Sequence, residues 1–281
     1  MRLIVHPFFD PETSSFSYVL IDPGSRVCAV IDPVLGYRGS PGEIDTEGAD
    51  RIVEFVKAND LIVEWLLETH VHADHLSASR YLKSRFVCAQ LGIGAEVVAL
   101  QQAMAPHLNA PIAVDGGQFD RLFSEGEKIC LGHSCGRVMA TPGHTPACVS
   151  YAFEGLVFVG DAIFMPDFGS GRCDFPGGDP LTLYASVQRL MALPDSTAVL
   201  TGHDYAPGGR HHQFSATVAE QRFGNIHLGR DTSAEDFARM RHERDALLDL
   251  PTLMEVAVPF NLVAGSVSPG ELKSSAEGLA A

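Results

Sequence analysis

The amino-acid sequence predicts a mixed α/β sandwich with one functional site at its edge. Two observations predict this fold class. Short apolar segments of strand character alternate with helical segments in both halves of the 281-residue chain. Several predicted strands also end in histidine or aspartate, as is typical where rigid elements deliver side chains to a shared site.

The first half is expected to open with a hairpin. Two apolar runs, 16–21 and 27–32, flank the turn sequence Asp22-Pro23-Gly24. Further on, Ile52, Val53 and Val56 recur at helical spacing, and a buried strand leads into a histidine-rich segment. The elements predicted after the hairpin are a helix at 48–59, a strand at 62–67 and helices near 77–85 and 93–104.

The second half repeats the alternation of strands and helices. Its predicted strands lie near 127–131, 137–140, 148–153, 156–159 and 197–200. Its predicted helices lie near 181–192, 214–223 and 234–248. The Gly/Pro/Asp-rich loop at 165–180 is longer than a simple connection requires, which favours a functional role.

Composition limits the possible partners. The formal net charge is −15, and a surface this acidic repels phosphate backbones and anionic lipid, so neither nucleic acid nor a membrane is expected as a partner. An anionic substrate would need a local group of Arg or Lys. No run of about 20 apolar residues indicates a membrane span, and no export signal is visible, so a cytoplasmic location is expected.

The six cysteines form no CxxC pair. In a chain of this size and predicted location we expect free, mostly buried thiols and no disulfide framework. The residues concerned are Cys28, Cys88, Cys130, Cys135, Cys148 and Cys173.

The strongest chemical signal is the segment Thr69-His70-Val71-His72-Ala73-Asp74-His75. Histidines at i and i+2 lie about 200° apart around a helix, so this segment is predicted to be a loop. A loop anchored by a buried strand can turn His70, His72, Asp74 and His75 toward one point. Imidazole and carboxylate groups without cysteine suit zinc or iron and argue against Cu(I) or an iron–sulfur cluster.

Three further candidates stand at separate strand ends. His144 lies in a Pro-Gly-His-Thr turn before a strand, and Asp161 and His203 each follow a short apolar strand. Asp32 is expected to bond the metal loop. The remaining histidines are interpreted as ordinary surface or core residues: His6, His107, His133, His211, His212, His227 and His242.

Taken together, these motifs resemble the metallo-β-lactamase superfamily over roughly residues 5–225. The resemblance rests on the His70–His75 cluster and on Ile31-Asp32-Pro33-Val34, Thr141-Pro142-Gly143-His144-Thr145, Gly160-Asp161 and Gly202-His203-Asp204. It implies an αββα sandwich, with the metal at one edge of the paired sheets.

Within that superfamily the chain looks like the persulfide (sulfur) dioxygenase branch, in its bacterial form. The segments that carry this likeness are 169–179, His203-Asp204-Tyr205, Arg210 and Asn225-Ile226-His227. The resemblance implies one Fe(II) per chain, held by His70, His144 and Asp161. It also implies a homodimer and the oxidation of glutathione persulfide with O2 to sulfite and glutathione. Some members carry Cys where Ser170 stands, so a role for that thiol cannot operate here.

Two histidines and one carboxylate on one face leave open positions on Fe(II), as in non-haem oxygenases. His72, Asp74, His75 and His203 would then orient ligands and waters. The same residues could equally hold two zinc ions, with Asp161 bridging them.

Outside the metal ligands, Arg172 and Arg210 are the candidates for binding the carboxylates of glutathione, because guanidinium groups bind them in bidentate fashion. Tyr205 is a candidate hydrogen-bond donor to substrate or to a metal-bound water.

We expect a catalytic domain at 1–230, with a C-terminal helix and tail at 231–281 packed on it.

The leading alternative is a binuclear zinc hydrolase of the glyoxalase II type, a glutathione thioesterase. That family usually has His in place of Val71 and a longer, more basic C-terminal region than residues 206–281 here. A secreted β-lactamase is disfavoured by the missing export signal, and a lactonase lacks specific support. If the chain were a non-catalytic binding protein, at least one metal-ligating residue of the pattern would be expected to be replaced, and none is.

Overall fold

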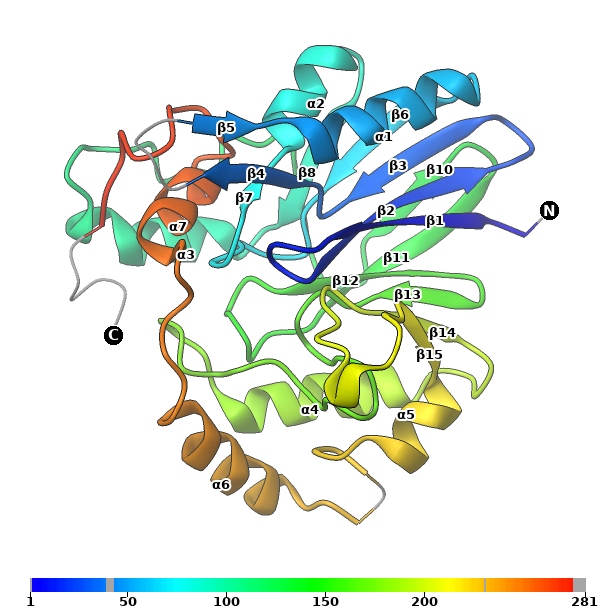
Figure 1. The fold of residues 1–281 in the computed structure, drawn as a ribbon, viewed down its shortest axis with the longest axis vertical. Coiled ribbons are helices and arrows are strands. Elements are labelled where there is room, and N and C mark those ends of the chain that lie inside the picture. Colours follow the sequence, from blue (N-terminus) through cyan, green and yellow to red (C-terminus); the bar gives the residue numbers. More distant parts are fainter. Residues whose placement is uncertain (1, 39–42, 230, 275–281) are drawn as a thin grey trace.

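Two six-stranded β-sheets pack face to face, and helices cover their outer faces (Figure 1). This computed structural model describes residues 2–38, 43–229 and 231–274. The four-layer order of helix, sheet, sheet and helix confirms the predicted αββα sandwich. The last part of the predicted C-terminal tail, 275–281, lies outside the described residues, and the division of the chain at residue 230 stays a prediction.

The first sheet has the strand order β1-β2-β3-β6-β8-β9. Its strands are β1 (Ile4–Asp10), β2 (Ser15–Asp22), β3 (Val27–Ile31), β6 (Ile62–Leu67), β8 (Gln90–Gly94) and β9 (Arg121–Phe123). The predicted hairpin is confirmed, since β2 and β3 pair antiparallel, whereas β3, β6, β8 and β9 run parallel. Helices α1 (Glu47–Ala58), α2 (Ser79–Arg85) and α3 (Val97–Met104) follow strands of this half.

The second sheet keeps its strands in chain order from β10 to β15. They are β10 (Lys128–Leu131), β11 (Ser134–Ala140), β12 (Val149–Phe153), β13 (Leu156–Phe158), β14 (Ala198–Leu200) and β15 (Ser215–Thr217). The helices of this half are α4 (Pro180–Met191), α5 (Val218–Gly224), α6 (Ala234–Asp245) and α7 (Met254–Leu262). In Figure 1 the first three lie below the second sheet, while α7 lies beside α3.

Alternating strand residues divide the core into layers. In β2, Val19 and Ile21 pack into the cluster that also holds Ile52 of α1, whereas Tyr18 and Leu20 face the second sheet. This is the period-two pattern of a strand buried on both faces. A third cluster joins the outer face of the second sheet to α4 and α6. The sheets are therefore rigid, and the loops at their edge are held at fixed positions.

Some elements differ from the sequence prediction. The helix expected at 93–104 begins at Val97, because residues 93–94 complete β8. The segment expected as a helix at 214–223 begins as strand β15. Strands β1, β8 and β9, helix α7 and a small sheet of β5 (Glu43–Asp45), β4 (Val34–Arg38) and β7 (Leu76–Ser77) were not predicted. Most of these segments are short, and pairing with neighbours far along the chain decides their conformation.

The prediction of six free thiols is wrong for one pair. Cys130 and Cys135 lie directly opposite each other in the β10–β11 hairpin and form a disulfide. Their spacing is local but does not form a CxxC motif, so only the register of the hairpin reveals the pair. Cys28, Cys88, Cys148 and Cys173 are free. Among the described residues no helix is both long and apolar enough to cross a bilayer.

Candidate metal centre

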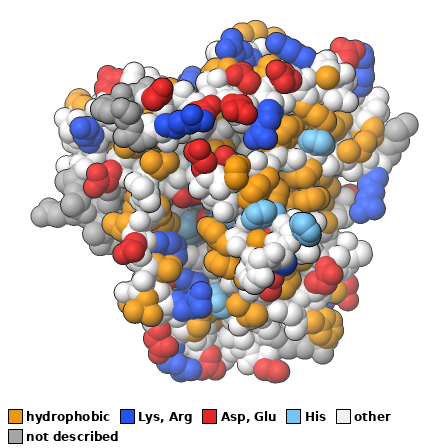
Figure 2. All heavy atoms as spheres, viewed as in Figure 1, with side chains coloured by type: hydrophobic (Ala, Val, Ile, Leu, Met, Phe, Trp, Pro, Cys, Tyr) orange, Lys and Arg blue, Asp and Glu red, His pale blue; other side chains and the backbone are white. Residues whose placement is uncertain are grey.

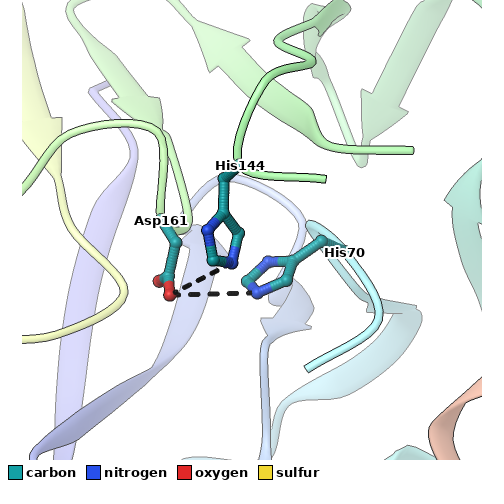
Figure 3. Close-up of side chains that lie close together, drawn as sticks. All are labelled: His70, His144 and Asp161. Carbon is teal, nitrogen blue, oxygen red and sulfur yellow. Dashed lines mark ion pairs between the residues drawn. The ribbon is translucent and has the colours of Figure 1, made fainter. Parts of the chain in front are cut away.

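Three side chains from three separate loops converge at one edge of the paired sheets (Figure 3). His70 follows β6, His144 lies in the β11–β12 turn, and Asp161 follows β13. The Asp161 Oδ2 atom lies 4.0 Å from His70 Nε2 and 3.6 Å from His144 Nε2. One ligand atom from each residue lies within 4.8 Å of the other two. This is the spacing of side chains that can share one metal ion.

Glycines allow the loops to approach this closely. Gly160 has φ +50°, and a Cβ at this position would lie 2.4 Å from Thr69 Oγ1 and 3.3 Å from His70 Nδ1. Gly143 has φ +132°, and a Cβ there would lie 2.3 Å from backbone atoms of Leu183. A side chain at either position would clash, and its backbone conformation would be strained. The glycine before Asp161 and the one before His144 are therefore required by geometry.

Asp32 fixes the loop that carries His70. Its Oδ1 accepts the Thr69 backbone N–H at 2.7 Å, and its Oδ2 accepts the Thr69 hydroxyl at 2.8 Å. The Thr69 oxygen in turn lies 2.9 Å from His70 Nδ1, so it accepts the Nδ1–H. This chain of hydrogen bonds leaves the Nε2 lone pair of His70 facing Asp161. The prediction that Asp32 bonds the metal loop is confirmed.

Both histidines of the triad favour the neutral, metal-binding form. Burial is the main cause that lowers the pKa of His70 and of His144. His144 Nδ1 lies 2.7 Å from the Arg172 carbonyl oxygen, which accepts its proton and leaves Nε2 free. Two free imidazole nitrogens beside a buried carboxylate form a suitable donor set for iron or zinc. His70, His144 and Asp161 therefore fit a metal ion.

A second group of side chains adjoins the triad. His203 Nε2 lies 3.4 Å from Asp161 Oδ1 and 3.5 Å from Asp74 Oδ2. Both carboxylate oxygens are buried without a hydrogen-bond partner. His203, although burial acts against it, has a raised pKa because of Asp161 and Asp74. Asp74, despite its burial, has its pKa lowered to about 2, first by His203. His75 and His72 lie close enough to Asp74 to form a further candidate ligand group.

His72 points its Nε2 away from the triad. That atom lies 3.1 Å from Asp32 Oδ1 and 3.3 Å from Glu68 Oε2. Glu68 also accepts hydrogen bonds from the hydroxyls of Ser77 and Ser79. Burial acts to lower the pKa of His72, but Asp32 and Glu68 outweigh it and raise the pKa. His72 is thus held by two buried carboxylates, and Glu68 is a residue that sequence reasoning missed.

His144 and Asp161 of the triad line a cavity of about 730 Å³. Figure 2 views this face, where histidine and cationic side chains border a hollow between the two halves of the molecule. The walls combine aromatic side chains with polar ones and with three arginines, Arg172, Arg241 and Arg244. Residues that line it include Tyr37, Asp74, His75, Phe164, Phe168, Phe175, His203 and Tyr205.

Three lining residues were not predicted as site residues. His227 is buried, and its Nδ1 accepts the Ser170 backbone N–H at 3.0 Å. Arg241 of α6 forms a buried ion pair with Asp245 and donates to the Ser170 carbonyl at 3.3 Å. Arg244 is exposed and, within the described part of the chain, forms no ion pair. Asn225-Ile226-His227 was noted in the sequence, but nothing there located α6 beside the metal loops.

The predicted substrate-binding residues differ in position. Arg172 lines the cavity, pairs with both oxygens of Asp174 at 2.6 and 2.7 Å, and donates to the Asp249 carbonyl at 2.8 Å. Arg210 lies outside the cavity lining, and its guanidinium is occupied by Asp167 and Asp204.

Tyr205 also lines the cavity. Its ring stacks on that of His203, with 5.6 Å between centroids, and lies tilted against that of Phe168 at 4.5 Å. The residue is 44% exposed, so it is accessible from the cavity.

Replacing Asp161 with alanine should abolish metal retention, because the variant leaves two neutral imidazoles without the anionic ligand. Metal content after anaerobic purification measures this. Asp195→Ala, at a surface ion pair with Arg222, is the matched control and should keep its metal. Full metal occupancy in Asp161→Ala would remove Asp161 from the ligand set.

Stability should fall with acidification through His227. Burial, aided by Arg241 and Arg244, lowers the pKa of His227 to about 4, whereas an unfolded histidine has a pKa of about 6.5. Between these values the unfolded chain binds a proton that the native state does not, so stability is full above pH 6.5 and declines toward pH 4. The decline attributable to His227 is about 2–3 kcal/mol.

Urea unfolding between pH 7 and pH 4 tests this pH dependence. His227→Asn keeps an acceptor for the Ser170 N–H and should show a smaller decline than the wild type. His211→Asn, at an exposed position, should match the wild type. Equal declines in wild type and His227→Asn would rule out the assigned role.

Comparison with known proteins agrees with this geometry. Residues 10–203 match the family described as the Metallo-beta-lactamase superfamily. The chain is 45% identical to a probable metallo-hydrolase of Burkholderia pseudomallei, with 96% of this chain and 95% of the relative covered. It is 30% identical to the mitochondrial persulfide dioxygenase ETHE1 of Mus musculus, with 95% and 91% covered.

Among solved structures, ETHE1 from Myxococcus xanthus superposes with a TM-score of 0.75 at 31% identity. The alignment covers 93% of this chain and 99% of that one. The resemblance to the persulfide dioxygenase branch that the motifs indicated is therefore confirmed, and the chain belongs to the metallo-β-lactamase superfamily.

Proposed function

We propose that this chain is a mononuclear Fe(II) persulfide dioxygenase, in which His70, His144 and Asp161 hold the iron. Glutathione persulfide, O2 and water would give glutathione, sulfite and two protons. The observation that carries the proposal is the triad itself, in which two neutral histidines and one carboxylate converge. The Nε2 of His72 is engaged by Asp32 and Glu68, so only its Nδ1 is left for a second ion. When bound, iron with open coordination positions supplies the redox chemistry.

The protein's own groups prepare the site. Thr69 and the Arg172 carbonyl fix the tautomers of His70 and His144, so both Nε2 atoms face the metal position. Phe164, Phe168 and Phe175 line the cavity and limit the water around a reactive persulfide. Tyr205 offers a hydroxyl at the cavity wall.

Charge at the cavity supports an anionic substrate. Although the chain has a net charge of −15, Arg172, Arg241 and Arg244 all line the cavity. Arg172 is paired with Asp174 and Arg241 with Asp245, whereas Arg244 forms no ion pair among the described residues. Glutathione carries two carboxylates, and guanidinium groups bind them in bidentate fashion. We propose Arg244 as the main carboxylate contact. Arg172 lines the cavity but would have to exchange its partners Asp174 and Asp249 to bind a substrate carboxylate, and we expect Arg210 to hold the 204–213 loop.

A binuclear hydrolase is the second candidate. Asp74 and His203 stand beside the unpartnered Oδ1 of Asp161, an arrangement that a second ion would suit. The name of the Burkholderia relative points in the same direction.

The cytoplasmic location and the homodimer expected from the sequence stay predictions.

Metal analysis and activity distinguish the two. Anaerobically purified protein should contain about one iron per chain and consume O2 on addition of glutathione persulfide. Two zinc ions per chain, with hydrolysis of a lactoyl-glutathione thioester and no O2 uptake, would contradict the proposal and support the hydrolase.

Arg244→Ala should raise the KM for glutathione persulfide with little change in kcat. Losing one charged contact costs about 1.5–3 kcal/mol, which is roughly a ten- to hundred-fold increase in KM. Arg172→Ala should act in the same direction. Arg239→Ala, on the same helix and paired with Asp236, is the control and should keep the wild-type KM. An unchanged KM in Arg244→Ala would reject its binding role.

A further inference from the structure

A small apolar chamber adjoins the metal loops and is lined in part by α3 and α7. These two helices lie side by side in Figure 1. The volume of the chamber is about 30 Å³, more than the roughly 10–15 Å³ needed by one water-sized molecule. Leu100 and Met104 come from α3, and Met254 and Val258 come from α7. The residues that line it are Val71, Ala73, Leu100, Met104, Thr145, Phe175, Pro176, Met254 and Val258.

The chamber has almost no polar character. Thr145 is the one hydroxyl-bearing residue of its lining, and its oxygen lies 3.1 Å from Cys148 Sγ. A water molecule inside a protein needs two to four polar partners, and apolar cavities without them stay dry and take up apolar molecules. All lining side chains except Pro176 are buried. The chamber is therefore suited to a small apolar ligand.

Its walls are continuous with the metal centre. Val71 and Ala73 alternate with His70, His72 and Asp74, and Thr145 follows His144 directly. The Phe175 ring packs edge-on against the His144 ring, with 5.1 Å between centroids. Ala73 and Phe175 line both the chamber and the main cavity. A molecule in the chamber would thus be separated from the metal cavity by a methyl group and one aromatic ring.

We propose that this chamber is a binding site for dioxygen beside the metal centre. The inference rests on the proposed function, because only an O2-consuming reaction needs such a site. Dioxygen is small and apolar, so it partitions from water into the chamber, whereas the charged persulfide is excluded. Dioxygen held in the chamber would then lie beside the metal centre without competing with the persulfide for the main cavity.

Xenon provides a test that does not depend on activity. Crystals of the protein pressurised with xenon should show the gas in the chamber between Leu100 and Met254. Leu100→Ala enlarges the chamber and should increase xenon occupancy at the same pressure. An empty chamber in both proteins would overturn the proposal.

Kinetics test the role of the chamber. Val258→Phe fills it and should raise the KM for O2 at least five-fold, while the KM for glutathione persulfide and the iron content stay at wild-type values. Val256→Phe, on the same helix but outside the lining, is the control. Leu100→Phe gives a second filling variant should Val258→Phe fail to fold.

The two hypotheses fail in different ways. A folded, iron-loaded filling variant with an unchanged KM for O2 would contradict the role of the chamber as a dioxygen site. It would leave the proposed dioxygenase activity unaffected. An iron-loaded wild type that consumes no O2 would overturn both the proposed function and the role of the chamber as a dioxygen site.

Discussion

The carboxylate of Asp32 is the constraint on which the metal centre depends. Asp32 follows β3 in a left-handed conformation, with φ +47°, which costs a residue other than glycine about 1 kcal/mol. In return its two oxygens accept the Thr69 N–H and hydroxyl and face the His72 Nε2. This one side chain therefore sets the direction of both His70 and His72. A loop with two neighbouring histidines would otherwise have many conformations, and few of them would bind a metal.

The 169–174 loop connects the metal centre to the cavity-lining arginines of α6, Arg241 and Arg244. The Ser170 N–H and carbonyl are held by His227 and Arg241, and the Arg172 carbonyl accepts the proton of His144. The Cys173 N–H donates to Asp245, the partner of Arg241. The arginines of α6 and the orientation of His144 thus depend on one shared segment. Gly171 allows this loop to lie against the Asp161 backbone, since a Cβ at this position would lie 2.0 Å from the Asp161 carbonyl oxygen.

The number of metal ions that the site can hold depends on two sets of side chains on either side of the triad. Asp32 and Glu68 hold the Nε2 of His72 on one side, while its Nδ1 is buried without a hydrogen-bond partner and belongs to a candidate ligand group with Asp74 and His75. Asp74 and His203 stand on the other side of Asp161, where a second ion would find ligands. Both arrangements would draw on groups that lie on loops at one edge of the sheets. Fold alone therefore does not select the reaction, and the local hydrogen bonds do.

The sequence by itself determined a mixed α/β sandwich and a histidine-rich loop that, with His144, Asp161 and His203, offers metal ligands at strand ends, because apolar periodicity and residue type are local patterns. The αββα layering and the choice of His70, His144 and Asp161 among those candidates were implied only by the family resemblance. Only the tertiary structure decided which arginine lines the cavity, since Arg244 and Arg210 look alike in sequence but α6 packs beside the site while Asp167 and Asp204 occupy Arg210. It also decided the disulfide between Cys130 and Cys135 and the apolar chamber. The register of a hairpin and the packing of α3 against α7 arise from contacts between residues that no local spacing relates.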